Sequence, residues 1–248
     1  MSTLSVLSDI SITQLCTPPT HVYQASVPGH GLVAVTRWAP AWQGLSHTDQ
    51  ELGKAGAVLI SPEDPRVKNF KPMIEPFHPE SIRRVDDARI ASFGLSSYGY
   101  DFRAAPEYKL FKGELPVGSD GVVDYKNITD DMFEHHEGPS IVIPPHGFIL
   151  ARSVERVRIP RDILALCIGK STIARVGINC LCTPIEPEWE GYITFEFHNT
   201  LSLPNRFYAN EGVLQLVFLQ GDRNCKTSYA DRGGKYQNQA EQIILPRV

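Results

Sequence analysis

The residues best suited to chemistry lie in one stretch of the chain, between positions 169 and 199. Its first part reads G-K-S-T-I-A-R (169–175) and supplies an ammonium group, two hydroxyls and a guanidinium, all of which bind phosphate oxygens. Its second part reads E-G-Y-I-T-F-E-F-H-N (190–199) and sets a carboxylate, Glu196, in an aromatic strand. A phosphate-binding turn followed by such an acid/base residue predicts chemistry on a nucleotide.

The strand around Glu196 predicts where its carboxylate points. Because side chains alternate across a strand, Ile193, Phe195 and Phe197 are expected to face a core, and Thr194 and Glu196 the opposite side. Partial removal from water would raise the pKa of this carboxyl toward the range that suits proton transfer near neutral pH. The alternative interpretation is an ordinary exposed glutamate on a polar face.

The turn before that strand has two interpretations. A short helix is predicted over 171–176, with Ser171 as its cap, and the helix start together with Lys170 and Arg175 would suit phosphate. The turn is not a Walker A loop, since that motif needs a glycine at position 164, which is Leu164. The alternative is a capped helix on the surface.

A zinc site is not expected. His135-His136-Glu137 contains H-x-E, one half of the signature of zinc deaminases, but the other half requires P-C-x-x-C. The chain instead has Cys180-Leu181-Cys182, which on a strand places both thiols on one face as packing residues. The G-x-S-x-G motif of serine hydrolases does not occur in the sequence.

Composition narrows the class of protein. The 248 residues are 42% hydrophobic and 21% charged, as in globular proteins, and the net charge of −4 argues against a nucleic-acid partner. The N-terminus resembles no signal peptide, and the sequence contains no apolar run long enough to cross a membrane. With five cysteines, an odd number, the chain is expected to be cytoplasmic with reduced thiols.

The pattern of short apolar runs predicts an all-β fold with a few short helices. Runs bounded by Pro, Gly, Asn and Asp indicate a sandwich, jelly roll or barrel rather than a βαβ sheet. Ser8-Asp9 predicts the start of a first helix. Residues 16–72 differ in composition from the rest, and the polar tail at 223–248 is expected to be mobile. The predicted strands are Tyr108–Phe111, Ser140–Ile143, Phe148–Ser153, Ala165–Ile168, Tyr192–Phe197 and Val213–Leu219.

Several motifs in the same order resemble a known family. They are S-S-Y-G-Y-D-F-R (96–103), G-K-S-T-I-A-R (169–175), T-P-I-E-P-E-W-E-G-Y-I-T-F-E-F (183–197), Y-A-N-E-G (208–212) and Y-A-D-R-G-G-K-Y-Q-N-Q (229–239). Together they resemble bacterial dCTP deaminases of the trimeric dUTPase-like superfamily. The resemblance runs from about Met73 to the C-terminus and leaves 16–72 as an unusual insertion in a single domain of residues 1–248.

The resemblance implies a fold and a reaction. The fold would be a distorted jelly roll, or dUTPase-like β-barrel, assembled as a homotrimer with active sites shared between subunits. The reaction would be the zinc-independent hydrolysis of dCTP to dUTP and ammonia, with Mg²⁺ carried on the triphosphate and no metal on the protein. Water would attack C4 of cytosine while one carboxylate moves the protons.

The resemblance also implies the site residues. Glu196 matches the general acid/base and Arg175 the arginine that orients water and carboxylate. The other positions, which match substrate-binding residues, are Lys170, Ser171, Thr172, Ile173, Ala174, Glu186, Thr194, Phe195, Gln215, Tyr229, Lys235 and Gln239.

Two other functions stay open from sequence. The first is a dUTP diphosphatase, or a bifunctional enzyme that produces dUMP, with Asp101 holding the attacking water near the α-phosphorus. The second is a nucleotide-sensing or partner-binding protein that uses residues 16–72 as its contact surface. The presence of Glu196 and Arg175 favours catalysis over binding alone.

Overall fold

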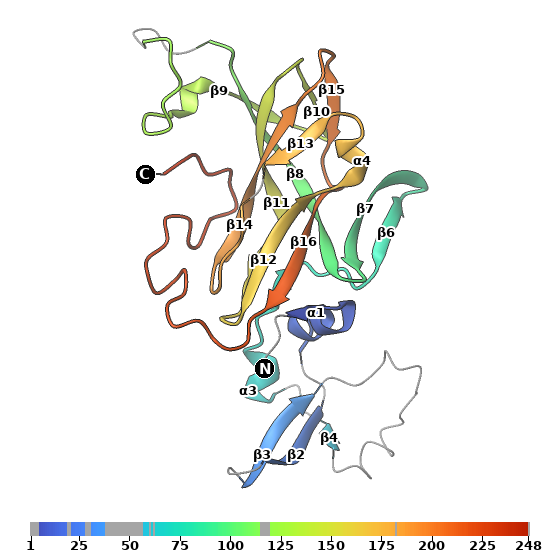
Figure 1. Ribbon diagram of the computed structural model, residues 1–248. Coiled ribbons are helices and arrows are strands. Elements are labelled where there is room, and N and C mark those ends of the chain that lie inside the picture. Colours follow the sequence, from blue (N-terminus) through green and yellow to red (C-terminus); the bar gives the residue numbers. More distant parts are fainter. Residues whose placement is uncertain are drawn as a thin grey trace. The chain divides into compact units, whose positions relative to one another are not determined.

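The computed structural model describes residues 5–18, 21–27, 31–37, 57–59, 61, 63–114, 120–181 and 183–247 (Figure 1). The chain forms two compact units. The larger comprises residues 1–9 and 74–248, and the smaller residues 10–73. None of the helices within the described ranges is long and apolar enough to span a membrane.

The smaller unit contains most of the segment with the different composition. Its strands β2 (His21–Val27), β3 (Gly31–Arg37) and β4 (Ala57–Leu59) form an antiparallel sheet in the order β3-β2-β4. Helix α3 spans Pro65–Lys68, and helix α1, Asp9–Cys16, begins at the residue where the sequence predicts it. The backbone N–H of Met73 donates to the carbonyl of Leu15 at 2.8 Å, which ties the end of this unit to its beginning.

The larger unit is built on a curled antiparallel sheet of eleven strands (Figure 1). Its main path runs β1-β16-β8-β11-β14-β13. Strand β12 pairs with β16, β5 with β11, β9 with β8, and β6 with β7, which in turn pairs with β8. Strands β10 and β15 form a separate pair. The strands are β1 (Ser5–Val6), β5 (Ile74–Glu75), β6 (Ser81–Val85), β7 (Ala88–Ser96), β8 (Gly99–Phe111), β9 (Phe133–Glu137), β10 (Ser140–Ile143), β11 (Phe148–Arg158), β12 (Ile163–Gly169), β13 (Ile178–Leu181), β14 (Glu190–Asn199), β15 (Asn205–Tyr208) and β16 (Gly212–Gln220).

This architecture confirms the mainly-β prediction. Each of the six strands expected from the sequence lies within a strand of the structure, and Ser140–Ile143 has the predicted bounds. Among the residues of this unit that the structure describes, the helical content consists of the short helix α4 (Ser171–Ala174), the 3-10 turn η2 (Asp130–Met132) and the first residue of α1.

The core lies between the main sheet and the β10–β15 pair. Phe197 from β14 and Phe207 from β15 have ring centroids 4.6 Å apart, and Tyr108 from β8 meets Phe207 edge to face at 6.1 Å. All three side chains are buried. Aromatic pairs of this kind add to the stabilisation that burial alone gives, so they hold β15 against β14 and β8 of the main sheet.

A bulge in β11 controls the register of the neighbouring strand β14. The pairing between the two strands shifts between Arg152 and Arg156. At this point the buried Ser153 hydroxyl accepts a hydrogen bond from the N–H of Ile193 at 2.9 Å and donates one to the carbonyl of Glu155 at 2.6 Å. The bulge is therefore satisfied internally and joins the two strands.

A buried ion pair lies at the same bulge. Glu155 is fully buried, and its carboxylate accepts hydrogen bonds from Arg103 Nε at 2.7 Å and from the Arg103 backbone N–H at 3.1 Å. Burial raises the pKa of Glu155, although Arg103 favours its charged form. The guanidinium also lies 4.3 Å from the ring centre of Phe93. A buried charge needs such partners, because an unpaired one is costly.

We predict that Glu155→Gln lowers the free energy of unfolding by about 3–5 kcal/mol, because it leaves the Arg103 guanidinium buried without its counter-charge. Chemical denaturation measures the change. Glu137→Gln is the matched control, since Glu137 is exposed at the end of β9, and it should change the free energy of unfolding by less than about 0.5 kcal/mol. Equal stabilities of Glu155→Gln and the control would contradict this account of the bulge.

Candidate active site

The strand β14 presents Glu196 on the face opposite the aromatic core. Its pairing with β11 places Glu196 beside Leu150 and Thr194 beside Arg152. Phe195 and Phe197 are buried on the other face, as the alternation predicts, whereas Glu196 and Thr194 are half-buried. The carboxylate therefore projects from a mostly apolar surface that is partly withdrawn from water.

A cavity of about 860 Å³ lies over this face. Five of the residues expected to act on the substrate line it together: Glu186, Thr194, Glu196, Tyr229 and Gln239. The rest of its wall consists of Ile128, Phe148, Leu150, Leu164, Thr183, Pro184, Ile185, Pro187, Trp189, Ile193, Tyr236, Ile244 and Pro246. A largely apolar cavity with a few convergent polar groups is the usual form of a small-molecule site.

The C-terminal tail (dark red in Figure 1) contributes Tyr229, Tyr236, Gln239, Ile244 and Pro246 to the lining of this cavity. Gln239 pairs with Gly191 as in a parallel strand, and its carbonyl accepts a hydrogen bond from the N–H of Tyr192 at 3.1 Å. Further along the tail, the N–H of Ile244 donates to the hydroxyl of Thr194 at 3.1 Å. Ile243 is buried and packs against Leu150 together with Met132 and Phe133. The tail is thus continuous with the surface that carries Glu196.

Ion pairs hold the beginning of the tail. Arg161, in the turn between β11 and β12, contacts Glu188 and the tail residue Asp231, each at 2.5 Å. The hydrogen bond from Arg161 lowers the pKa of Asp231 to about 2. Arg232 pairs with Glu186 in the cavity wall and lies 5.2 Å from the ring centre of Tyr229. These contacts order Glu186 and Tyr229 beside each other.

One buried polar atom in the cavity is left without a partner. Gln239 is only 8% exposed, and its side-chain oxygen, Oε1, makes no hydrogen bond within the described part of the chain. A buried amide oxygen of this kind costs free energy unless something donates to it.

The basic turn lies elsewhere in the subunit. Lys170 immediately precedes helix α4, and Arg175 immediately follows it. Ser171, Thr172, Ala174 and Arg175 are exposed, and Ile173 is half-buried. The prediction of Ser171 as the helix cap is wrong: Lys170 occupies the capping position, and no side chain caps the helix. The helix also ends at Ala174 rather than at 176, since glycine at 177, with φ of +79°, allows the chain to turn back.

Gln215 of the predicted site lies near Lys170, as does Asp101, which was considered only for the alternative diphosphatase. The ammonium of Lys170 contacts the carboxylate of Asp101 at 2.5 Å. Asp101 stands opposite Gln215 in the pairing of β8 with β16, and the amide of Gln215 donates to the hydroxyl of Ser96 at 2.8 Å.

The remaining two predicted residues lie apart from this group. Lys235 is exposed on the tail, where its carbonyl accepts a hydrogen bond from Arg247 at 2.9 Å. Phe195 borders a second, much smaller cavity of about 40 Å³ that also reaches Glu196.

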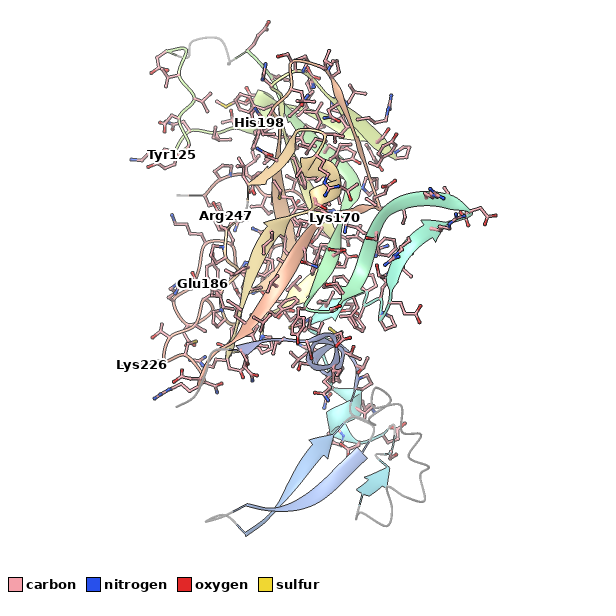
Figure 2. The ribbon with its side chains drawn as sticks, turned by 45° about the vertical axis from the view of Figure 1, so that its right-hand side comes forward. Tyr125, Lys170, Glu186, His198, Lys226 and Arg247 are labelled. Carbon is pink, nitrogen blue, oxygen red and sulfur yellow. The ribbon has the colours of Figure 1, made fainter. Side chains whose placement is uncertain are left out.

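The structure therefore brings the predicted residues together as two separate groups. Figure 2 shows Lys170 away from Glu186, which lies on the side where the tail runs. The cavity of Glu196 is lined by two carboxylates and, within the described residues, by neither lysine nor arginine. The turn carries the cations. A ligand with several phosphates needs cations such as those of the turn.

The groups considered for zinc are engaged in other contacts. His135 Nε2 lies 2.8 Å from Asp130, and His136 Nε2 lies 3.4 Å from Glu134. Cys180 is on β13, and position 182 falls outside the described residues. In the parts of the chain that the structure describes, no three His, Cys, Asp or Glu side chains are grouped so that they could bind a metal ion.

Among the residues of the cavity region that sequence reasoning missed, four bear on the site. Trp189 and Tyr236 line the cavity, and Arg232 pairs with Glu186. All three lie inside the quoted motifs. Their closeness in sequence to Glu186 and Tyr229 is the signal that could have identified them. The fourth is Ile193, which was assigned to the core but is half-buried and borders both cavities. The bulge in β11 lies opposite Ile193 and changes the direction in which this side chain points.

Comparisons with known proteins agree with the sequence motifs. A family model described as dCTP deaminase-like matches residues 67–221. A dCTP deaminase of Acidithiobacillus ferrooxidans (strain ATCC 53993 / BNL-5-31) is 53% identical over 176 residues, which cover 71% of this chain and 91% of the relative. A dCTP deaminase of Francisella tularensis subsp. novicida is 51% identical over 175 residues, or 71% and 90% of the two chains.

Two solved structures show a partial likeness to this chain. A 2'-deoxycytidine 5'-triphosphate deaminase from Agrobacterium tumefaciens is 13% identical, with a TM-score of 0.42 over 60% of this chain and 44% of that one. The native EIAV dUTPase is 20% identical, with a TM-score of 0.32 over 41% and 87% of the two chains. The family match covers more than half of the sequence and includes both the basic turn and the strand of Glu196, and so the chain belongs to the dCTP deaminase-like family.

Proposed function

We propose that this protein is a dCTP deaminase, which hydrolyses dCTP to dUTP and ammonia and so supplies dUTP for dUMP and dTTP synthesis. Membership of the family and the names of relatives at 51–53% identity support the reaction. The observation that carries the proposal is the cavity, whose lining brings Glu196 together with Thr194, Glu186 and Gln239.

In the proposed mechanism, Glu196 moves the protons. Water adds to C4 of cytosine, and Glu196 takes a proton from it and delivers it to N3. A second proton passes to the amino group, which leaves as ammonia, so that dCTP and water give dUTP and ammonia without electron transfer. The apolar surroundings of Glu196, which include Leu150 and Phe148, support this role, because they limit the water that competes for the carboxylate.

The polar groups of the cavity would orient the nucleoside. Glu186 and Thr194 would contact the sugar and the base, and Tyr229 and Gln239 would hold the nucleotide from the tail. Lys170, Ser171, Thr172 and Lys235 would bind the phosphates. Mg²⁺ would enter as part of the substrate, bound to the triphosphate.

We propose further that the active site is shared between the subunits of a homotrimer. The cavity has no lining cation within the described residues, whereas Lys170 and Arg175 lie in a separate group. A neighbouring copy that places its turn at the cavity would bring Arg175 to Glu196 and cations to the phosphates. The surroundings of the turn fit such a contact, since five large apolar side chains of the region are exposed: Ile168, Val176, Leu181, Leu201 and Leu203.

The proposed location is the cytoplasm. Cys225 is a free thiol, which suits a reducing compartment. The other proposed partner is dCTP itself, with no role for nucleic acid or membrane.

We predict that Glu196→Gln reduces ammonia release from dCTP at least about 100-fold, because the amide cannot accept the proton from water. A coupled assay for ammonia measures the loss, and calorimetry should show that dCTP still binds. Glu137→Gln, which removes an exposed carboxylate on β9, should retain the wild-type rate. Normal deamination by Glu196→Gln would refute the assigned role, and no ammonia from the wild-type protein would favour a nucleotide-sensing function.

We predict that dCTP yields ammonia and dUTP in equal amounts. Separate incubations with dCTP and dUTP, analysed by chromatography and by a pyrophosphate assay, test this outcome. Pyrophosphate and dUMP from dUTP would show instead that the protein acts on the phosphate chain, either as a diphosphatase or as a bifunctional enzyme.

A mixing experiment tests the shared site. Glu196→Gln and Arg175→Ala subunits, co-expressed with different tags and purified by both, form mixed trimers. If each site takes its glutamate from one subunit and its arginine from the next, every mixed trimer contains one intact site, and about a third of the wild-type activity returns.

Each variant alone should remain inactive in that experiment, which serves as its control. No recovery of activity in trimers that contain both variants would place Glu196 and Arg175 of each site in the same subunit. Light scattering that gives the mass of a monomer in the presence of dCTP would contradict the trimer itself.

A further inference from the structure

Asp101 and Lys170 form a nearly enclosed ion pair behind the basic turn. Lys170 Nζ lies 2.5 Å from Asp101 Oδ2, and the two side chains are only 12% and 11% exposed. The residues are 69 positions apart in the chain. Asp101 belongs to β8, at the centre of the main sheet, and Lys170 follows the end of β12.

The pairing is needed because of burial. An ammonium group removed from water is costly unless a negative partner lies beside it. Burial raises the pKa of Asp101, while the hydrogen bond from Lys170 opposes that shift. Lys170 is the one charged group that acts on the Asp101 carboxylate in this environment among the described residues.

The surroundings of Asp101 are rigid. Gln215 stands opposite it on β16 and is itself held by Ser96. Glycine at position 99 has a φ of +152°, and a Cβ there would lie 2.6 Å from the carbonyl oxygen of Leu216, so the approach of β8 to β16 leaves no space. The carboxylate is therefore fixed by the sheet, and Lys170 is fixed by the carboxylate.

Fixing Lys170 also fixes the turn. The carbonyl of Lys170 accepts hydrogen bonds from the N–H groups of Ile173 at 3.2 Å and of Ala174 at 3.1 Å. Lys170 thus connects two parts of the molecule. Its side chain is bound to Asp101 of the sheet, and its backbone begins the exposed segment that carries Ser171, Thr172 and Arg175.

We infer that Asp101 is a positioning residue for nucleotide binding, which holds Lys170 and the turn of residues 170–175 in the geometry that receives the triphosphate. The inference rests on the proposed function and adds to it a residue that does not touch the nucleotide. In this inference the Asp101 carboxylate binds Lys170. It does not hold a water that attacks the α-phosphorus.

The test measures binding without turnover. In the Glu196→Gln background, calorimetry gives the Kd of dCTP and of deoxycytidine for Asp101→Asn, Lys170→Gln and the double variant. Asp101→Asn should weaken dCTP binding about tenfold, because a charged hydrogen-bond partner of the phosphates loses its fixed position. The affinity for deoxycytidine, which carries no phosphate, should change less than about twofold.

The double variant separates positioning from general destabilisation. If Asp101 acts through Lys170, then adding Asp101→Asn to Lys170→Gln should change the Kd of dCTP by less than about twofold. This comparison stays informative if Asp101→Asn alone folds poorly, since the double variant removes both buried charges. Asp162→Asn is the matched control, because that carboxylate accepts a side-chain hydrogen bond from Gln220 at 2.9 Å in the same unit, and it should alter neither affinity.

Three results would overturn the inference: an unchanged Kd of dCTP in Asp101→Asn, equal losses for dCTP and deoxycytidine, or a full effect of Asp101→Asn in the Lys170→Gln background. The failure of the proposed function looks different. If no variant binds dCTP, or if the wild-type protein binds it and releases no ammonia, the assigned reaction is wrong whatever the role of Asp101.

Discussion

The alternation of side chains on β14 is the constraint on which the site depends. One face of this strand contributes Phe195 and Phe197 to the aromatic core, and the other presents Thr194 and Glu196. A slip of one residue would bury the carboxylate and expose the rings. The register is secured on the β11 side by the bulge, where the buried Ser153 hydroxyl and the Arg103–Glu155 pair satisfy the irregular backbone. Polar interactions inside the sheet thus determine where the acid of the cavity lies.

Charge is distributed in the subunit so that neither group is suited to a nucleotide by itself. The cavity gathers carboxylates, of which Glu186 is neutralised by Arg232 from the tail. The turn gathers cations, of which Lys170 is neutralised by Asp101 from the sheet. In each place the ion pair holds a residue of the predicted site in position, Lys170 through Asp101 on β8 and Glu186 through Arg232 on the tail. A triphosphate with its cytosine ring is complementary to the two groups combined, and this complementarity is the electrostatic argument for the shared site that we propose.

Local sequence patterns were sufficient for the strands and for the side of β14 that carries Glu196. Alternation and turn residues are encoded within a few positions, and the six expected strands all occur. The patterns failed where contacts distant in sequence decide the outcome. The position of Ile193 depends on a bulge in another strand, and the capping position of α4 belongs to Lys170, whose partner is 69 residues away. The separation of the turn from the cavity was also invisible, because motif order carries no information on which surface each motif occupies.

Gly191 links the evolution of the acid-bearing strand to that of the tail. It has a φ of +145°, and a Cβ there would lie 2.6 Å from the backbone nitrogen of Gln239. Because the obstacle is main chain, no change of side chain at 239 could relieve it. A larger residue at 191 would have to displace the tail around Gln239. Glu196 lies five positions further along the strand and would stay in place. Mutational drift at this one site would therefore alter access to the cavity and the residence time of whatever it holds, without altering the acid itself.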